Sequence, residues 1–517
     1  MLESSASPDI DVLVVGAGPT GLTAALVLAQ SGIDCRIVDK RPEPSGSSRA
    51  LGLQARSMEV LAGLGVTDEI EEAAYRLGAS SILRGRRRVA RMEWVPPQSR
   101  FPHTYVLPQA GLEGILRRRL EDFGVTVGAG VEVTAVASDD DGVRADLLDG
   151  GSIRASWLIG ADGARSAVRT AAGIGFPEHA TGEVYHLADA LLDLPIALDD
   201  GVMWLGPEGP LMLMRLPGDE RLWRVFVDVT QHAIEEMEPL AAEALTELLN
   251  HRGPGGISVL EVQWSSIFRT RIGLADSYRR GRIFLAGDAT HVFPPFGGQG
   301  MNLGIQDAVN LGWRLAAVVR GANSTLLHAY ESERRSVAEA VISDVDARRR
   351  LFALRNPVAR TARDALLAVG ARSRRARRSA SLQNSQLAIS YRDRASGGKD
   401  GPFPRPGDRA PHAAIVGTTS HELFGPDHLT LLVFGTGHPP DVAPPGLEVI
   451  TRHLDGSVES EVFQRYGFTP SDTGWVLVRP DGYVASRGDT LSSGSHDPVH
   501  VGRSGVDHGR GDDGAHR

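Results

Sequence analysis

The sequence predicts an α/β protein whose α/β pattern is interrupted by a mainly β segment and followed by a smaller C-terminal α/β domain. Three observations lead to this fold class. First, a buried strand, an apolar helix and a second buried strand follow one another between Val12 and Asp39, which is a βαβ unit. Second, from about Glu183 to Phe268 short strands alternate with Gly and Pro turns, as in a β-meander. Third, short strands return beyond a Pro- and Gly-rich break, Gly397 to His412.

The composition is that of an ordinary globular protein, because 42% of the 517 residues are hydrophobic and 23% are charged. No apolar run reaches the roughly 18–20 residues of a membrane helix, and the N-terminus lacks the basic segment of a signal peptide. The single cysteine, Cys35, excludes an intrachain disulfide and favours the reducing cytoplasm. A net charge of -9 argues against general nucleic-acid binding. We predict no metal site and no membrane partner.

The first motif, Gly16-Ala17-Gly18-Pro19-Thr20-Gly21, fits G-x-G-x-x-G between the first predicted strand and helix. Its glycines permit a tight turn and close approach of the backbone to a pyrophosphate, and the amides at the helix start favour phosphate charge. Asp39, followed by Lys40, ends the second strand, where a carboxylate can accept ribose hydroxyls. A glycine turn without a ligand would look the same, but strand, helix and Asp39 together favour dinucleotide binding. This motif does not separate FAD from NAD.

The segment Arg282 to Asn302, RIFLAGDATHVFPPFGGQGMN, favours a flavin. Asp288 follows a buried strand and offers a carboxylate to a sugar-alcohol chain such as ribityl. Pro294-Pro295 form a rigid wall, and three glycines allow backbone to contact a flat ring. The following helix points its N-terminus at this place, which favours negative charge. We expect His291 to be a structural cap rather than a catalytic base.

These segments resemble the single-component, FAD-dependent aromatic monooxygenases of the p-hydroxybenzoate hydroxylase type, known as group A. WLIGADGARSAVR is similar to their second fingerprint, SSRALGLQARSMEVLAGLG to the segment whose first Arg lies beside the flavin, and YVLPQAGLEGILRRRL to the helix whose Gln contacts FAD. The resemblance covers Asp11 to Glu331. Pro404 to about Arg487 resembles the thioredoxin-like domain of phenol and polyketide hydroxylases, and its lack of cysteine favours a packing or assembly role.

The resemblance implies non-covalent FAD and a set of residues that hold it, while no side chain is assigned as catalytic. The ADP half falls to Gly16, Gly18, Pro19, Thr20, Gly21, Asp39 and Lys40; Arg49, Gln109 and Asp162 border the cofactor; Asp288 binds ribityl; Pro295, Gly298, Gly300, Met301 and Asn302 frame the isoalloxazine; and Arg49, Pro295 and Phe296 lie near the flavin ring.

The expected domains follow from the same pattern. A Rossmann-like FAD-binding domain of the glutathione-reductase type is formed by residues 1–182 and 271–395, a substrate-binding β-sheet domain by 183–270, a thioredoxin-like domain by 396–491, and a disordered tail by 492–517.

The meander also carries large apolar side chains that could line a substrate pocket. Because alternate residues of a strand face opposite sides, the sequence does not decide which side chains face the pocket and which belong to the core. The candidates are Met203, Met212, Trp223 and Phe226, together with Phe296 from the loop Pro294 to Gly298, here called the flavin loop.

The predicted function is that of an FAD-dependent monooxygenase that uses NADPH or NADH and O₂. The resemblance implies hydroxylation of a polycyclic aromatic compound, an intermediate of polyketide antibiotic biosynthesis, through a flavin C4a-hydroperoxide. Two alternatives on the same scaffold are Baeyer–Villiger oxygen insertion and a non-redox FAD-containing cyclase. The expected assembly is a monomer or a homodimer.

Overall fold

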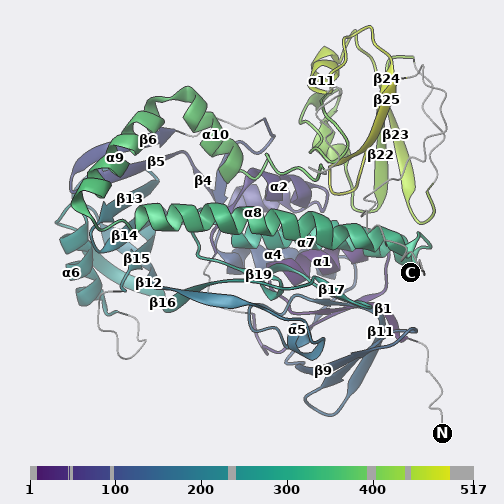
Figure 1. Cartoon of the computed structure of the whole chain (residues 1–517), viewed down its shortest axis with the longest axis horizontal. Coiled ribbons are helices and arrows are strands. Elements are labelled where there is room, and N and C mark those ends of the chain that lie inside the picture. The colour runs from purple at the N-terminus through teal and green to yellow at the C-terminus, as the bar shows by residue number, and fades with distance from the viewer. Residues whose placement is uncertain are drawn as a thin grey trace, which may run out of the picture.

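The structure, a computed structural model, describes residues 8–44, 46, 50–93, 98–230, 240–392, 403–436 and 444–489. Figure 1 shows a sheet covered by helices, a second sheet at the far end of the long helix α8 (His328–Phe352), and a small domain formed by the C-terminal described residues. This arrangement confirms the predicted α/β fold class. The predicted disordered tail, 492–517, lies outside the described residues.

The first sheet has a parallel core, with strand order β17-β18-β11-β1-β2-β8, and β10 and β9 attach to it through β11. Buried strands of a parallel sheet read as continuous apolar runs, which explains the sequence VLVV in β1. Helix α1 packs against α7 and α4. The bounds are β1 (Ile10–Val15), β2 (Cys35–Asp39), β8 (Val127–Ala129), β9 (Val133–Ser138), β10 (Val143–Leu147), β11 (Ser152–Gly160), β17 (Arg279–Arg280), β18 (Ile283–Leu285), α1 (Pro19–Gln30), α4 (Gln109–Glu121), α5 (Ala167–Ala171) and α7 (Gly300–Val319).

Cys35 lies on β2 and is buried. Burial, together with the nearby carboxylates of Asp34 and Asp11, raises the pKa of its thiol to about 12. The only thiol of the chain is therefore neutral at neutral pH.

The second sheet has the order β19-β16-β12-β15-β14-β13-β5-β6. This sheet extends beyond the predicted β-sheet domain, residues 183–270, because it includes β5 and β6 and because β12 begins at Glu178. Strand β5 joins the sheet by pairing in parallel with β13, and it covers an edge that the meander alone would leave open. The bounds are β5 (Ala79–Arg84), β6 (Arg87–Glu93), β12 (Glu178–Asp193), β13 (Gly201–Gly206), β14 (Gly209–Arg215), β15 (Leu222–Asp228), β16 (Ser258–Leu274), β19 (His291–Val292) and α6 (Ala242–Arg252).

Helix α8 connects the two sheets, and two helices after it turn back over the second sheet (Figure 1). Asn356 caps the first of them, since its side chain accepts hydrogen bonds from the amides of Val358 and Ala359, and Pro357 occupies the first helical position. Among the described residues, no helix is long and apolar enough to cross a membrane. The bounds are α9 (Pro357–Arg372), α10 (Arg374–Asn384), α2 (Ala55–Ala62), α3 (Thr67–Ala73), β3 (Gly52–Leu53), β4 (Tyr75–Leu77) and β7 (Thr104–Val106).

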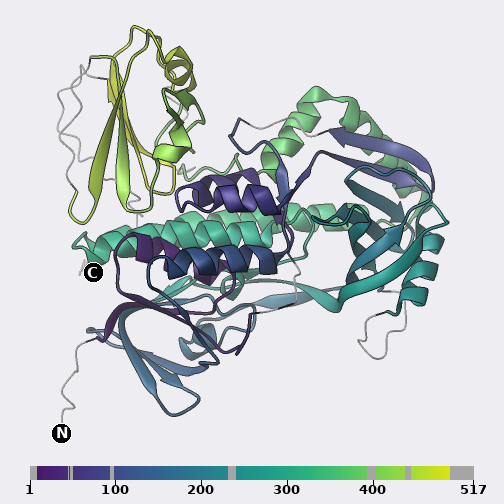
Figure 2. The same cartoon turned by 180° about the vertical axis from the view of Figure 1, so that it is seen from behind.

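The C-terminal domain has its own four-stranded sheet, in the order β23-β22-β24-β25, and its own aromatic core. Phe434 stacks on Phe468, meets Phe463 edge-on and packs at a tilt against Tyr466 in that core. Figure 2, seen from behind, shows this domain next to α2 and the helices of the first sheet. The bounds are β20 (Ala414–Ile415), β21 (Thr418–Thr419), β22 (His428–Phe434), β23 (Glu448–Leu454), β24 (Gly474–Val478), β25 (Val484–Asp489) and α11 (Ser460–Arg465).

One contact of this domain is a buried ion pair with α2. Both carboxylate oxygens of Glu59 accept hydrogen bonds from Arg409, at 2.8 and 2.6 Å, and Arg56 and His421 lie beside them. Burial opposes ionisation of Glu59, but Arg409 and His421 outweigh it and hold the pKa of Glu59 well below its usual range. The carboxylate is therefore charged and paired at neutral pH.

We expect Arg409→Met to lower the free energy of unfolding by about 3–5 kcal/mol, because it leaves Glu59 buried without its main partner. Arg465→Ala, which removes a surface pair with Glu461, is the control and should cost at most about 1 kcal/mol. A pKa lowered by folding stabilises above the unfolded pKa, and that contribution is lost as the pH falls through the folded value. Urea unfolding should therefore show the difference shrinking in acid; equal stability of both variants at pH 7 would contradict it.

Candidate cofactor and substrate site

The turn between β1 and α1 uses its three glycines in two ways. Gly16 has φ +103°, and a Cβ there would lie 2.3 Å from the Ala161 oxygen; at Gly21 a Cβ would lie 1.8 Å from the Gly16 oxygen. Packing therefore demands both glycines. A Cβ at Gly18 would meet nothing within 4 Å. No described side chain caps the first turn of α1, so Gly18 leaves both space and helix-start amides for an anion.

The turn containing Asp288 lies directly against this first turn at Thr20. A Cβ at Gly287, which has φ +62°, would lie 2.5 Å from Thr20 Oγ1, and one at Gly304 of α7 would lie 2.3 Å from the same atom. Asp288 itself is exposed. The structure thus brings the predicted pyrophosphate and ribityl residues to one end of the parallel sheet.

Asp39 ties β2 to the glycine turn. Its Oδ2 accepts a hydrogen bond from the Ala17 amide at 2.7 Å, and Arg41 donates to Oδ1 from its amide and its guanidinium. Burial opposes ionisation of Asp39, but these hydrogen bonds outweigh it and lower its pKa. Asp39 is therefore a charged acceptor beside the turn, while Lys40 is exposed.

Gln109 and Asp162 lie at the starts of two helices. Gln109 begins α4, and its Nε2 donates to Glu113 Oε1 at 2.8 Å. Asp162 follows β11 and accepts hydrogen bonds from Ser166 Oγ at 2.5 Å and the Val168 amide at 3.1 Å, which fixes the start of α5. Arg49, which was expected beside the flavin, lies outside the described residues.

Asn302 holds the Pro/Gly loop in place. Its fully buried side chain donates to the backbone oxygens of Gly52 and Gly298, both at 2.7 Å, and accepts from the Gln54 amide at 2.8 Å. Asn302 therefore acts on the loop backbone. Around it, Pro295 is half-buried, and Gly298 has open space beside it but a φ of +62°, which favours glycine. Gly300 starts α7 without a described side-chain cap, and Met301 packs against the core.

The second sheet brings Met203, Met212 and Phe226 into one cross-strand row, because Met203 pairs with Met212 and Met212 with Phe226. Phe296 of the flavin loop is 2% exposed and meets the edges of Phe226 and Tyr185, with ring centroids 5.9 Å apart in each pair. An apolar aromatic cluster therefore joins this face of the sheet to the flavin loop.

Trp223 was predicted as a candidate for the substrate pocket, but it lies on the other face of the sheet. It lies three residues from Phe226, so its side chain is on the opposite face of β15. There it is 3% exposed and packs in the core that contains Leu245 and Leu249 of α6. Tyr185, which stacks on Phe226 at 4.5 Å, and Phe352, which meets Phe296, were not predicted. No sequence signal distinguishes these two from core residues.

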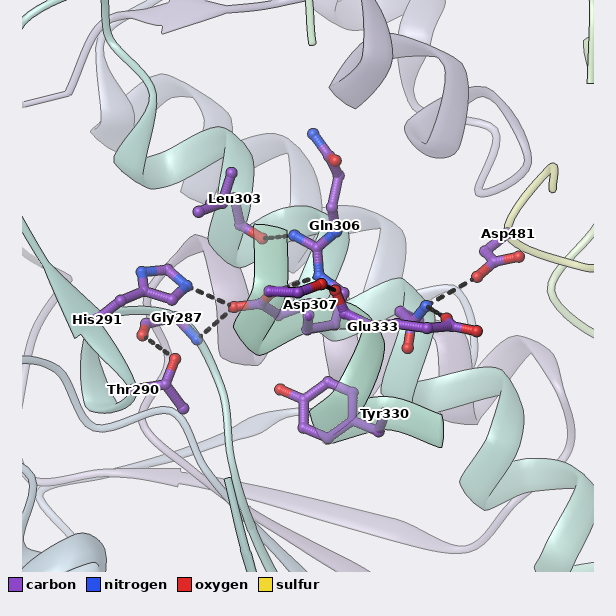
Figure 3. A network of polar contacts seen from close by, with 12 residues as sticks. Gly287, Thr290, His291, Leu303, Gln306, Asp307, Tyr330, Glu333 and Asp481 are labelled. Atoms are coloured by element: carbon purple, nitrogen blue, oxygen red, sulfur yellow. Dashed lines mark hydrogen bonds and ion pairs between the residues drawn. The ribbon is translucent and has the colours of Figure 1, made fainter. Parts of the chain in front are cut away.

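His291 belongs to a buried polar network (Figure 3). Its Nε2 lies 2.8 Å from Asp307 Oδ2, and Arg334 donates to Asp307 Oδ1 at 2.6 Å. The Gly287 amide donates to Asp307 Oδ2 at 3.1 Å. Burial opposes ionisation of Asp307, but Arg334 and His291 outweigh it and lower its pKa. His291 thus pairs with Asp307 inside the fold, and its role as a structural residue stays a prediction. Asp307 was not predicted, although it is a lone acid in the apolar helix segment LGIQDAVNLGW.

Among the described residues, no group of three or more His, Cys, Asp or Glu side chains could hold a metal ion. The site consists of backbone amides, carboxylates and an aromatic cluster.

Residues 9–345 match the family described as FAD binding domain, and residues 403–500 match aromatic-ring hydroxylase, C-terminal. The relative 6-methylpretetramide 4-monooxygenase from Streptomyces rimosus is 34% identical over 510 residues, which cover 92% of this chain and 90% of that protein.

Two solved structures share the fold over nearly the whole chain. Anhydrotetracycline hydroxylase from Streptomyces rimosus has a TM-score of 0.77 and 28% identity, covering 95% of this chain and 98% of that one. A Diels-Alderase of pyrroindomycin biosynthesis has a TM-score of 0.73 and 25% identity, covering 95% and 99%.

Gly18→Val tests the space at the start of α1. The backbone there, at φ -77° and ψ -179°, suits any residue, so the fold should be unchanged, whereas the added side chain should block a phosphate. We expect FAD affinity to fall by about tenfold or more, or ~1.4 kcal/mol. The control is Gly370→Ala in α9, where a Cβ also meets nothing within 4 Å. Titration of apoprotein with FAD measures both; unchanged affinity in Gly18→Val would contradict this site.

Asp288→Ala should lose one charge-assisted hydrogen bond to the ribityl chain. That bond is worth about 1.5–3 kcal/mol, roughly ten- to a hundred-fold in FAD affinity. Asp141→Ala, an exposed turn carboxylate, is the control. A purified Asp288→Ala protein with the wild-type flavin-to-protein ratio and affinity would exclude the ribityl role.

Proposed function

We propose a reaction for this chain from the premise that it belongs to the FAD-dependent aromatic-ring hydroxylases, and is therefore an FAD-dependent monooxygenase. The proposed reaction is hydroxylation of a polycyclic aromatic compound, a polyketide antibiotic intermediate, at the expense of NADPH or NADH and O₂.

The observation that carries this proposal is the apolar row Met203, Met212 and Phe226, which Phe296 joins to the flavin loop. Aromatic and thioether side chains make broad, adaptable contact with a flat apolar ring system. The relative that is 34% identical over nearly the whole chain is named for its action on 6-methylpretetramide. These two observations together favour a large substrate over a small phenol.

The residues present fit FAD. The uncapped start of α1 beside Gly18 would hold the pyrophosphate, Asp39 the adenosine ribose and Asp288 the ribityl chain. The amides of the uncapped start of α7 favour negative charge on the flavin ring. The chemistry that bound FAD supplies is hydride acceptance from NAD(P)H and activation of O₂. The buried aromatic cluster excludes water from the side where we place the substrate.

Two alternatives use the same fold. Oxygen insertion in the Baeyer–Villiger manner would also add one oxygen atom but would open or expand a ring. A non-redox cyclisation is the second alternative, and the fold shared with a Diels-Alderase is the observation that favours it. It would consume no NAD(P)H, so cofactor consumption and product structure separate all three reactions.

We expect a tri- or tetracyclic phenol or quinone to accelerate NAD(P)H oxidation and to gain one oxygen atom with its ring system intact. Simple phenols and p-hydroxybenzoate should give little above the substrate-free rate of NAD(P)H oxidation, because they are too small to contact the whole apolar row. NAD(P)H absorbance, product mass and product structure are the measurements. Strong turnover of p-hydroxybenzoate or phenol without response to any polycycle would overturn the proposed substrate class.

A further inference from the structure

The turn between β24 and β25, Arg479 to Tyr483, is where the C-terminal domain contacts helices α2, α7 and α8. Arg479 donates to both oxygens of Glu333 on α8, at 2.7 and 2.9 Å. Asn310 of α7 donates to Asp481 Oδ2 at 3.0 Å, and Arg56 of α2 donates to the Asp481 backbone oxygen. The turn is therefore anchored on three helices of the FAD-binding domain.

Tyr483, the last residue of this turn, leads toward the interior. Its ring packs on that of Tyr391, with centroids 4.1 Å apart. Arg334 of α8, which is fully buried, donates from Nη1 to the Tyr391 hydroxyl at 2.9 Å. Tyr391 therefore links Tyr483 of the C-terminal domain, through its ring, to the guanidinium of Arg334, through its hydroxyl.

Arg334 in turn holds Asp307, and Asp307 holds the turn that carries Asp288 (Figure 3). Arg334 and Asp307 are both fully buried. Buried hydrogen bonds to charged groups are stronger than exposed ones, and water does not easily replace a lost partner. A change at Tyr391 should therefore act on the Gly287 amide through two charged side chains.

We propose that the C-terminal domain positions the flavin through the series Tyr483, Tyr391, Arg334 and Asp307, which fixes the Gly287–Asp288 turn. Tyr391 and Arg334 are positioning residues, since neither belongs to the flavin loop itself. The inference rests on the proposed role of Asp288 toward the ribityl chain. It gives the cysteine-free C-terminal domain a role in cofactor binding beyond packing.

The other anchor of the domain shares a residue with this turn. Arg56 pairs with Glu59, which Arg409 also holds, and Arg56 donates to the Asp481 backbone oxygen and lies over the Tyr483 ring, 4.7 Å from its centroid. A variant that removes only the Tyr391 hydroxyl leaves both anchors in place, so it separates loss of this series from loss of docking in general.

Tyr391→Phe is the test, because it removes the hydroxyl and keeps the ring that packs on Tyr483. Tyr466→Phe is the control, since it removes a buried hydroxyl inside the C-terminal domain that donates to the Pro411 oxygen at 3.1 Å. Apoprotein of each full-length variant is titrated with FAD and, separately, with ADP, which lacks the ribityl chain. We expect Tyr391→Phe to bind FAD about tenfold more weakly and ADP as wild type does, and Tyr466→Phe to match wild type with both.

The remaining outcomes overturn the proposal in distinguishable ways. Wild-type FAD affinity in Tyr391→Phe, with weakened affinity in Asp288→Ala, would exclude the series while the ribityl site stands. Unchanged affinity in both would exclude the role of Asp288 and the inference with it. Equal weakening of FAD and ADP, or equal effects of Tyr391→Phe and Tyr466→Phe, would show general destabilisation instead of positioning.

Discussion

The close approach of α1 to α7 is the constraint on which the cofactor site depends. At Thr20 the two helices and the turn after β18 meet where Gly287 and Gly304 leave no room for a side chain. Further along, a Cβ at Gly312 would lie 2.6 Å from Val27. Any larger residue would push the helices apart, and with them the Gly16–Gly21 turn and the Gly287–Asp288 turn. The glycines of α7 therefore serve packing, in the middle of a helix where they would otherwise be unfavourable.

Charge, rather than apolar surface alone, fixes how the C-terminal domain sits. Arg56, Glu59 and Arg409 lie at one contact, and Glu333 and Arg479 at another. Buried ion pairs add little net stability, because desolvation offsets their attraction, but a misplaced partner is costly. Apolar faces tolerate sliding, whereas bidentate pairs do not. Such a junction favours a single arrangement of the two domains, which the proposed series from Tyr483 to Asp307 requires.

Local features of the sequence predicted local features of the structure well. The turn at Gly16 to Gly21, the strand ending at Asp39 and the loop before α7 each depend on neighbouring residues, and each lies where expected. Pairings between distant segments could not be predicted from the sequence. Nothing in ASSILR indicates that β5 joins β13, and the face of Trp223 depends on which neighbours its strand acquires. Likewise Asp307 is on α7, Arg334 on α8 and Tyr391 in the segment after α10, and only tertiary packing brings the three together.

The burial of Cys35 has a chemical consequence for an enzyme that handles O₂. Reactive oxygen species attack the thiolate, and because burial raises the pKa of the Cys35 thiol to about 12, the side chain is protonated at pH 7. The side chain also lies inside the sheet, out of reach of a peroxide in solution. Oxidative damage during turnover should therefore fall on residues other than Cys35, and loss of activity on ageing should not be reversed by thiol reductants.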